Sequence, residues 1–342
     1  MFNNSTNILF FFTLFGGILL TISSNSWVGA WMGLEINLLS FIPIMTNAEN
    51  IYTTEASMKY FLIQALASSI LLFMVLTTTF IEKSLMIIKS TQVDLMIIIP
   101  LLLKSGVPPF HWWFPGVMEG LSWINCLILM TVQKLAPMML MINTLQSKMW
   151  LMISIICSIT MGSIGGLNQI STRKLLTYSS INHMGWLLSA MLIGENMLLM
   201  YFFIYSVMTI TIVLIMKMYK ISFINQMFNT NYSPIYKFLL FSSMLSLSGL
   251  PPFSGFFNKW IIIQFLTKNE LLIMNTFMVM MSLITLYYYL RITYSAFLIL
   301  HSENSWKYKN FYQMNNSMLM STTWLMSTAS LALISLPLTT LL

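Results

Sequence analysis

The phrase Ser105-Gly106-Val107-Pro108-Pro109-Phe110 returns later in the chain as Ser248-Gly249-Leu250-Pro251-Pro252-Phe253, with a single substitution. Both copies lie inside apolar stretches that are long enough to cross a lipid bilayer. A Pro-Pro pair removes two backbone donors and forbids a regular helix. Because hydrocarbon cannot satisfy the freed carbonyls, such a break is tolerated only where protein or a wet cavity surrounds it. Paired broken helices in two halves of a membrane protein indicate a transport pathway.

The overall composition is that of a membrane protein. The chain is 57% hydrophobic and 7% charged, with a mean hydropathy of +0.79, whereas soluble domains carry about 25% charged residues. The first apolar run has no basic residue before it and no small-residue cleavage site, so we expect a membrane span rather than a signal peptide. The many Met residues and only two Arg residues fit an AT-rich mitochondrial genome.

Features that would hold a cofactor are missing from the sequence. No Gly-rich phosphate loop follows a strand pattern, so we expect no nucleotide binding by this chain. We also expect no nucleic-acid partner. Cys126 and Cys157 are too few for an iron–sulfur cluster or a four-ligand zinc site. We therefore expect this chain to bind no cofactor and no metal.

Apolar runs divide the chain into about eleven transmembrane helices, which predicts an all-α polytopic membrane protein with one domain over residues 1–342. The fourth and ninth spans contain the repeated phrase and are expected to be broken. The predicted spans are 3–22, 24–45, 56–81, 92–119, 121–143, 149–167, 172–193, 196–216, 234–267, 271–300 and 318–341.

The spacing of the two breaks predicts an inverted repeat. The broken spans are five spans apart, an odd number, so they must cross the membrane in opposite directions. The repeating unit is then five helices, with the fourth one broken in each unit. Repeat one covers about 3–143, repeat two covers about 149–300, and the helix at 318–341 is appended.

Basic residues are distributed unevenly between the two sets of loops. One side receives eight Lys or Arg residues and the other receives four, which places the first side inward. The N-terminus is then inside and the C-terminus outside. The inward set is Lys59, Arg173, Lys174, Lys217, Lys220, Lys237, Lys307 and Lys309, and the outward set is Lys83, Lys89, Lys148 and Lys268.

Two charged residues lie too deep in their spans to reach the membrane surface. Glu35 is ~15 Å from either end of its span, and Lys134 is ~13 Å from the nearer end, at the helical rise. A charge at membrane depth costs at least ~2.5–3.5 kcal/mol, so each needs a partner or a purpose. Glu35 could be a protonated structural acid, but a functional role is favoured. The stem of Lys134 is too short for snorkelling to explain its position.

Three further residues extend this polar set. Lys104 directly precedes the first break, where a lysine also stabilises a helix C-terminus, and Lys259 follows the second break. His183 is either a satisfied core residue or a bridge between proton sites. Separated sites joined by hydrated cavities are what lateral proton conduction requires. For Arg291, an interfacial anchor is as good an interpretation as a role in this polar set. His111 is interpreted first as part of an aromatic lining at the break.

Five phrases together resemble the antiporter-like membrane subunits of respiratory complex I, and the composition resembles an insect form. The resemblance covers essentially the whole chain. The phrases are Gly33-Leu34-Glu35-Ile36-Asn37, Leu103-Lys104-Ser105-Gly106-Val107-Pro108-Pro109-Phe110-His111, Gln133-Lys134-Leu135-Ala136-Pro137, Ser179-Ser180-Ile181-Asn182-His183-Met184-Gly185-Trp186 and Gly249-Leu250-Pro251-Pro252-Phe253.

The resemblance implies a role for each buried group. Glu35 matches the family's carboxylate and Lys104 its lysine partner on the broken helix. Lys134 matches the central relay lysine, and Lys259 matches the distal one. His183 matches a histidine near the hydrated axis. Bacterial counterparts begin with three further helices that are absent here, which is expected to change packing against neighbours without removing the proton path.

The resemblance also implies a setting. The chain would be a proton-translocating subunit of the mitochondrial NADH:ubiquinone reductase, in the inner membrane, with its N-terminus on the matrix side and its C-terminus on the intermembrane side. NADH, flavin, iron–sulfur clusters and ubiquinone would be bound by other subunits. Its partners would be other membrane-arm subunits, including neighbouring antiporter-like ones, and lipid. Two alternatives stay open: a stand-alone cation/proton antiporter, and a non-catalytic membrane scaffold.

Overall fold

The computed structural model describes residues 5–47, 49–84, 90–144, 148–229, 234–251 and 253–299. Within these residues the chain is helical and has no strand, only an isolated bridge between Ser171 and Phe223. This confirms the all-α membrane fold. The helices are α1 (Ser5–Ser23), α2 (Trp27–Met45), α3 (Ile51–Ser84), α4 (Ser90–Ser105), α5 (Trp113–Gly120), α6 (Trp123–Met130), α7 (Val132–Ile142), α8 (Lys148–Gly166), α9 (Thr172–Ile193), α10 (Glu195–Tyr219), α11 (Ile224–Asn229), α12 (Pro234–Ser248), α13 (Ser254–Lys268) and α14 (Leu272–Tyr294), followed by the π-helical turn Ser295–Ile299.

Helices long and apolar enough to cross a membrane occur seven times in the described part of the chain. The first ten predicted spans each correspond to one described helix or to two consecutive ones. The predicted helix at 318–341 lies outside the described residues. The total of eleven therefore stays a prediction.

Helix α9 crosses the protein interior although it is too polar to count among those seven. Almost every residue from Leu175 to Met191 is buried, and these include Ser179, Ser180, Asn182 and His183. Polar groups at membrane depth are tolerated when they face protein rather than lipid. The burial of α9 therefore explains how the sequence can carry so many polar side chains in one span.

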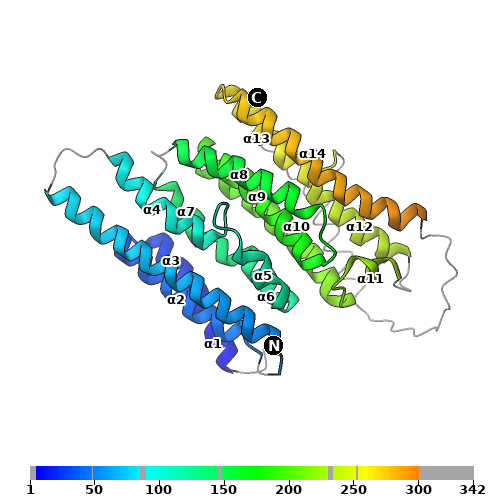
Figure 1. Cartoon of the computed structure of the whole chain (residues 1–342), viewed down its shortest axis with the longest axis horizontal. Coiled ribbons are helices and arrows are strands. Elements are labelled where there is room, and N and C mark those ends of the chain that lie inside the picture. The colour runs from blue at the N-terminus through cyan, green and yellow to red at the C-terminus, as the bar shows by residue number, and fades with distance from the viewer. Residues whose placement is uncertain are drawn as a thin grey trace. The chain divides into compact units, whose positions relative to one another are not determined.

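The chain divides into two compact units, Met1–Ser158 and Ile159–Leu342. Within each unit the described helices lie side by side as a bundle (Figure 1). The division falls inside α8, close to the join of the two predicted repeats. The inverted relation between the repeats and the single domain over 1–342 stay predictions.

Each broken span stops in the same backbone turn. Helix α4 ends before Gly106, which has φ +70°, and α12 ends before Gly249, which has φ +85°. In each turn the glycine amide and the following amide donate to carbonyls three and five residues earlier, at 3.1 to 3.4 Å. This is the Schellman arrangement, which needs a left-handed residue and favours glycine. Both predicted breaks are confirmed; Pro252 lies outside the described residues.

The fifth predicted span, 121–143, carries an interruption that the sequence reading did not anticipate. Helices α6 and α7 meet at Thr131, whose φ and ψ are −115° and −74°. Pro137, inside α7, cannot donate to the carbonyl four residues earlier and its ring crowds that carbonyl. The amide of Lys134 bonds to Thr131 O at 3.1 Å, a tighter turn than an α-helix makes. Lys134 therefore lies in the first turn of a new helix.

Helix α2, which carries Glu35, is held against α1 by two glycines. A methyl group on Gly17 would lie 3.0 Å from the Gly33 carbonyl oxygen, and one on Gly33 would lie 2.9 Å from Gly17 O. Backbones approach this closely only where both residues are small, as in membrane helix pairs generally. The contact fixes the face that α2 turns toward the rest of its unit.

The turn glycines lead to a stability prediction. Gly106→Ala or Gly249→Ala puts an L side chain into a left-handed conformation at a cost of about 1–2 kcal/mol. The new methyl would also meet the Trp113 ring or the Lys259 side chain at 3.2 Å. We expect less folded protein in the membrane and a lower midpoint of heat unfolding. Gly116→Ala is the matched control, because that helical position has open space around it. Equal effects at all three glycines would contradict the turn assignment.

Candidate functional site

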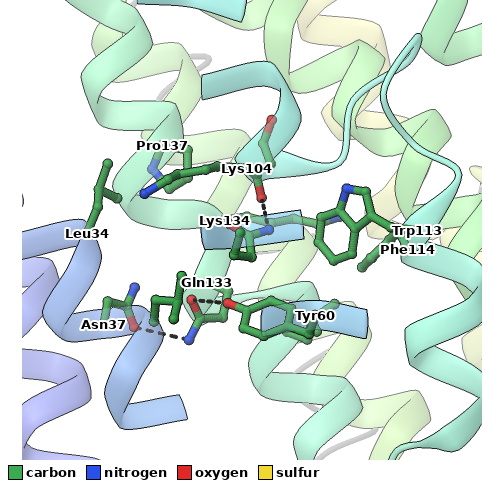
Figure 2. Close-up of a pocket in the computed structure, with 13 residues that line it drawn as sticks. Leu34, Asn37, Tyr60, Lys104, Trp113, Phe114, Gln133, Lys134 and Pro137 are labelled. Carbon is green, nitrogen blue, oxygen red and sulfur yellow. Dashed lines mark hydrogen bonds between the residues drawn. The ribbon is translucent and has the colours of Figure 1, made fainter. Parts of the chain in front are cut away.

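The buried charges of the first unit surround a small internal cavity. Its volume is about 20 Å³, which is room for one or two water molecules. Helices α2 to α7 all contribute to its wall. The side chains of Lys104 and Lys134 lie between Leu34 on one side and the Trp113 and Phe114 rings on the other (Figure 2). The remaining wall residues are Asn37, Leu38, Tyr60, Gln64, Ser105, Leu129, Gln133 and Pro137.

Lys134 is the most deeply buried of the cations whose side chains are described in this unit, at 2% exposure. Its Nζ has no hydrogen-bond partner among the described residues and lies 4.6 Å from the centre of the Phe114 ring. A cation over an aromatic face gains more when water is excluded. The Phe114 ring therefore stabilises the ammonium group but accepts no conventional hydrogen bond from it. The N–H groups of Lys134 stay available to cavity water.

Three polar side chains form a hydrogen-bonded floor of the cavity. Gln133 Nε2 donates to Asn37 Oδ1 at 3.0 Å, and the Tyr60 hydroxyl donates to Gln133 Oε1 at 3.3 Å (Figure 2). These bonds join α2, α3 and α7. Because Gln133 precedes Lys134 in the chain, they also hold the turn from which the lysine projects. The sequence reading missed Tyr60, and saw Asn37 and Gln133 only as parts of the resembling phrases.

Backbone carbonyls that lose their helical partners at the first break accept hydrogen bonds from side chains. Gln64 Nε2 donates to Lys104 O at 3.2 Å, and Trp113 Nε1 donates to Leu103 O at 3.3 Å. Lys104 is in the last turn of α4, where a cation is stabilised by the carbonyl end of the helix. The break therefore meets the requirement that backbone groups at membrane depth be satisfied within the protein.

Glu35 stands near Lys104 without touching it. The Glu35 carboxylate and Lys104 Nζ form no ion pair within 4.0 Å, unlike Lys59 and Glu55, which lie 2.6 Å apart on the surface of α3. The Glu35 carboxylate is within electrostatic range of Lys104. Glu35 is half-buried, and its Oε2 has no hydrogen-bond partner in the described part of the chain. The two charges thus act on each other through a gap rather than as a contact pair.

The second unit has its own buried cation at the second break. Lys259 Nζ donates to Ser248 O, the last carbonyl of α12, at 2.8 Å, and lies 5.8 Å from the Trp186 ring centre. Lys259 is 5% exposed. Lys259 follows the second break in sequence. Its side chain nevertheless points back, so that its ammonium group contacts the carbonyl end of α12, the half-helix before the break. Lys104 occupies the corresponding end of α4.

His183 lies at the same break. Its Nε2 is 3.2 Å from Leu247 O and its Nδ1 is 2.8 Å from the Tyr201 hydroxyl. A carbonyl only accepts, so Nε2 carries a proton, and in the neutral ring Nδ1 accepts from Tyr201. Asn258 on α13 also donates to the Tyr201 carbonyl at 3.3 Å. The Leu247 carbonyl thus sets the tautomer of the histidine, and Tyr201, which was not predicted from the sequence, holds its other nitrogen.

Two residues that the sequence left open occupy different surroundings. His111 is buried in the first break, with its ring 5.2 Å from that of Trp112, so it belongs to the aromatic lining there. Arg291 is exposed in the last turn of α14, as an anchor would be. Neither lines the cavity.

The described residues contain no group of three metal-binding side chains. Cys126 is buried and Cys157 is half-buried, and neither is in a disulfide bond. The five predicted site residues fall into two sets, one in each unit: Glu35, Lys104 and Lys134 in the first, and His183 and Lys259 in the second.

Known proteins resemble this chain over most of its length. Residues 24–285 match the family described as NADH:quinone oxidoreductase/Mrp antiporter, TM. NADH-ubiquinone oxidoreductase chain 2 of Anopheles gambiae is 52% identical over 92% of each chain. The protein of the same name from Aedes aegypti is 48% identical over 97% of each.

Solved structures share the fold at lower identity. A chain of respiratory complex I from Thermus thermophilus with bound aureothin superposes with a TM-score of 0.82 at 21% identity, covering 98% of this chain and 79% of that one. A chain of the Mrp complex from a Dietzia species superposes with a TM-score of 0.70 at 16% identity, covering 83% of this chain and 59% of that one.

The cavity floor gives a second prediction. Gln133→Leu removes the bonds to Asn37 and Tyr60 and leaves two buried polar groups unpaired, at a cost of about 1–3 kcal/mol. We expect a lower midpoint of heat unfolding. Gln264→Leu, at an exposed position of α13, is the matched control and should leave the midpoint unchanged. Equal midpoints for the two variants would show that the Gln133 network does not hold the cavity.

Proposed function

The chain belongs to the NADH:quinone oxidoreductase/Mrp antiporter family, and from this we propose that it is a proton-translocating, antiporter-like subunit of respiratory complex I. In that assembly the NADH:ubiquinone reaction takes place in other subunits, and this chain contributes proton transfer. The observation that carries the proposal is Lys134, a lysine buried in the protein interior beside a cavity of water size, with no hydrogen-bond partner among the described residues.

The proposed mechanism is charge coupling. Glu35 and Lys104 are close enough to sense each other's charge but have no direct contact. A change in the protonation of either alters the field at the cavity, and Lys134 then gains or releases a proton through cavity water. The proton next passes to Lys259, with His183 as an intermediate acceptor. Each lysine returns to its starting state when the next proton arrives, so the relay is cyclic.

The proposed setting is the mitochondrial inner membrane, which the chain crosses several times. The bias of basic residues supports a matrix-side N-terminus. Neighbouring antiporter-like subunits and lipid are the proposed partners, supported by the apolar outer face of α1, where Phe12 is 75% exposed. The flavin, iron–sulfur clusters, NADH and ubiquinone of the assembly are assigned to its other subunits.

A stand-alone cation/proton antiporter is the second candidate, and the superposition on a chain of an Mrp complex favours it. The two functions differ in what the chain needs in order to work. A stand-alone antiporter moves ions when purified alone into vesicles. A complex I subunit moves protons only within the assembly and only during electron transfer. Reconstitution of the purified chain therefore separates them.

The relay role of Lys134 can be tested by replacing its charge while keeping its bulk. Lys134→Met should assemble normally and lower proton translocation and coupled NADH oxidation by about tenfold or more, because a proton-transfer group is lost. Lys59→Met is the control, since Lys59 is exposed and its surface ion pair contributes little. Normal pumping by a fully assembled Lys134 variant would refute the relay, and loss of assembly alone would favour a scaffold.

The coupling between Glu35 and Lys104 is tested by a double-mutant cycle. Glu35→Gln and Lys104→Met should each impair pumping, because each leaves the opposite charge uncompensated at membrane depth. The double variant should be less impaired than the sum of the two effects predicts. The measurement is proton translocation per NADH oxidised in assembled complex. Strict additivity would mean that the two groups act independently.

A further inference from the structure

A buried lysine faces the ring of an aromatic side chain in each unit. Lys134 Nζ lies 4.6 Å from the centre of the Phe114 ring, and Lys259 Nζ lies 5.8 Å from that of Trp186. Both rings are themselves buried, at 1% and 0% exposure. A cation within about 6 Å of a ring face is attracted by the negative charge of that face, and more strongly where water is excluded. The two rings therefore act on the lysine charges and do not only fill space.

The ring matters more for Lys134 than for Lys259. Lys259 also donates a hydrogen bond to Ser248 O at 2.8 Å, so its charge has a second stabilising contact. Lys134 Nζ has no hydrogen-bond partner among the described residues, and there the Phe114 ring is the protein group that stabilises its charge. A buried ammonium group without a stabilising contact carries a large desolvation cost. The charged state of Lys134 therefore depends on Phe114.

The first break positions the Phe114 ring. Phe114 lies at the start of α5, where its amide donates to His111 O at 3.0 Å. A methyl group on Gly106 would lie 3.5 Å from Phe114 Cβ, so Phe114 packs on the glycine turn that follows α4. The Trp113 ring meets the Phe114 ring edge-on, with the ring centres 5.6 Å apart. These contacts hold Phe114 in the wall of the cavity that it shares with Lys134 (Figure 2).

We propose that Phe114 is a positioning residue that keeps Lys134 protonated at rest and so sets the pH range over which the relay works. The ring face attracts the ammonium form of the lysine and has no comparable attraction for the neutral amine. The protonated state is therefore favoured until the field at the cavity changes. This role rests on the proposed function, because it regulates the same site.

The other titratable groups around Lys134 stay in place when the ring is changed. Lys104 on α4 and Tyr60 on α3 line the same cavity, and Glu35 on α2 is within electrostatic range of Lys104. Helix α1 has no titratable side chain, and α5 and α6 contribute only apolar side chains to the cavity wall. A change in pH dependence on removal of the ring is therefore an effect of the ring.

Replacing the ring with an aliphatic side chain tests the proposal. Proton translocation by the assembled complex is measured across a range of pH. Phe114→Leu should move the alkaline fall in translocation toward lower pH by roughly 0.5 to 1.5 pH units, the shift that corresponds to one cation–π contact. The shift has this direction because Lys134 without the ring loses its proton at a lower pH. Phe114→Tyr keeps a ring face and should pump with the pH dependence of the unmodified complex.

Phe241→Leu is the matched control. Phe241, on α12 of the second unit, has the same 1% exposure, and its ring packs against the ring of Phe297, 5.2 Å away, rather than under a lysine. Because the same buried ring is lost, this variant should lower the midpoint of heat unfolding much as Phe114→Leu does. Its pH dependence should be that of the unmodified complex. An equal pH shift in both variants would mean that a packing defect causes it, and would overturn the proposal.

The outcomes separate this role of Phe114 from the proposed function. If Lys134→Met is impaired and Phe114→Leu keeps the pH dependence of the unmodified complex, the role of the ring is wrong and the relay stands. If Lys134→Met pumps normally, both are wrong. A density map of the unmodified assembly covers the case in which Phe114→Leu fails to assemble. Lys134 Nζ over the face of the Phe114 ring supports the proposal, and Nζ turned away from the ring toward a carboxylate or a carbonyl overturns it.

Discussion

The rest of the structure depends on one constraint: a helix that stops inside a membrane must have its free carbonyls satisfied by protein. The chain meets it twice, with the same glycine turn at Gly106 and Gly249. Carbonyls that are not satisfied within the turns accept hydrogen bonds from Gln64 at the first break, and from His183 and Lys259 at the second. Two side chains that stabilise the second break, His183 and Lys259, are therefore also members of the proposed proton path.

This dual role explains why the two units differ in detail although they repeat a phrase. Lys104 precedes its break and Lys259 follows its own, yet each belongs to the carbonyl end of the half-helix before the break. That end carries partial negative charge and favours a cation. A lysine that precedes the turn and a lysine that follows it can both place an ammonium group at this end. The repeated phrase forms the same turn in both units, while the lysine precedes the turn in one unit and follows it in the other.

Sequence reasoning predicted the parts of the fold that depend on composition and on local backbone chemistry. The breaks were predicted from the two Pro-Pro pairs. The membrane depth of Glu35 and Lys134 was inferred from span lengths and stays a prediction. The interruption at Thr131 was not predicted, because Pro137 by itself predicts only a kink in the helix. The interruption becomes evident from the hydrogen bond of the Lys134 amide to Thr131 O. Partners distant in sequence, such as Gln133 with Tyr60 and His183 with Tyr201, depend on packing between helices and have no local signal. The gap between Glu35 and Lys104 likewise appears only in three dimensions.

The most direct test of the central claim is a density map of the intact assembly that resolves ordered water around the buried lysines. We predict water in the cavity beside Lys104 and Lys134, within hydrogen-bond distance of Lys134 Nζ. We also predict a continuous row of water and polar side chains from Lys134 to Lys259. A dry cavity, or a layer of packed apolar side chains that separates the two lysines, would contradict a proton relay through this chain.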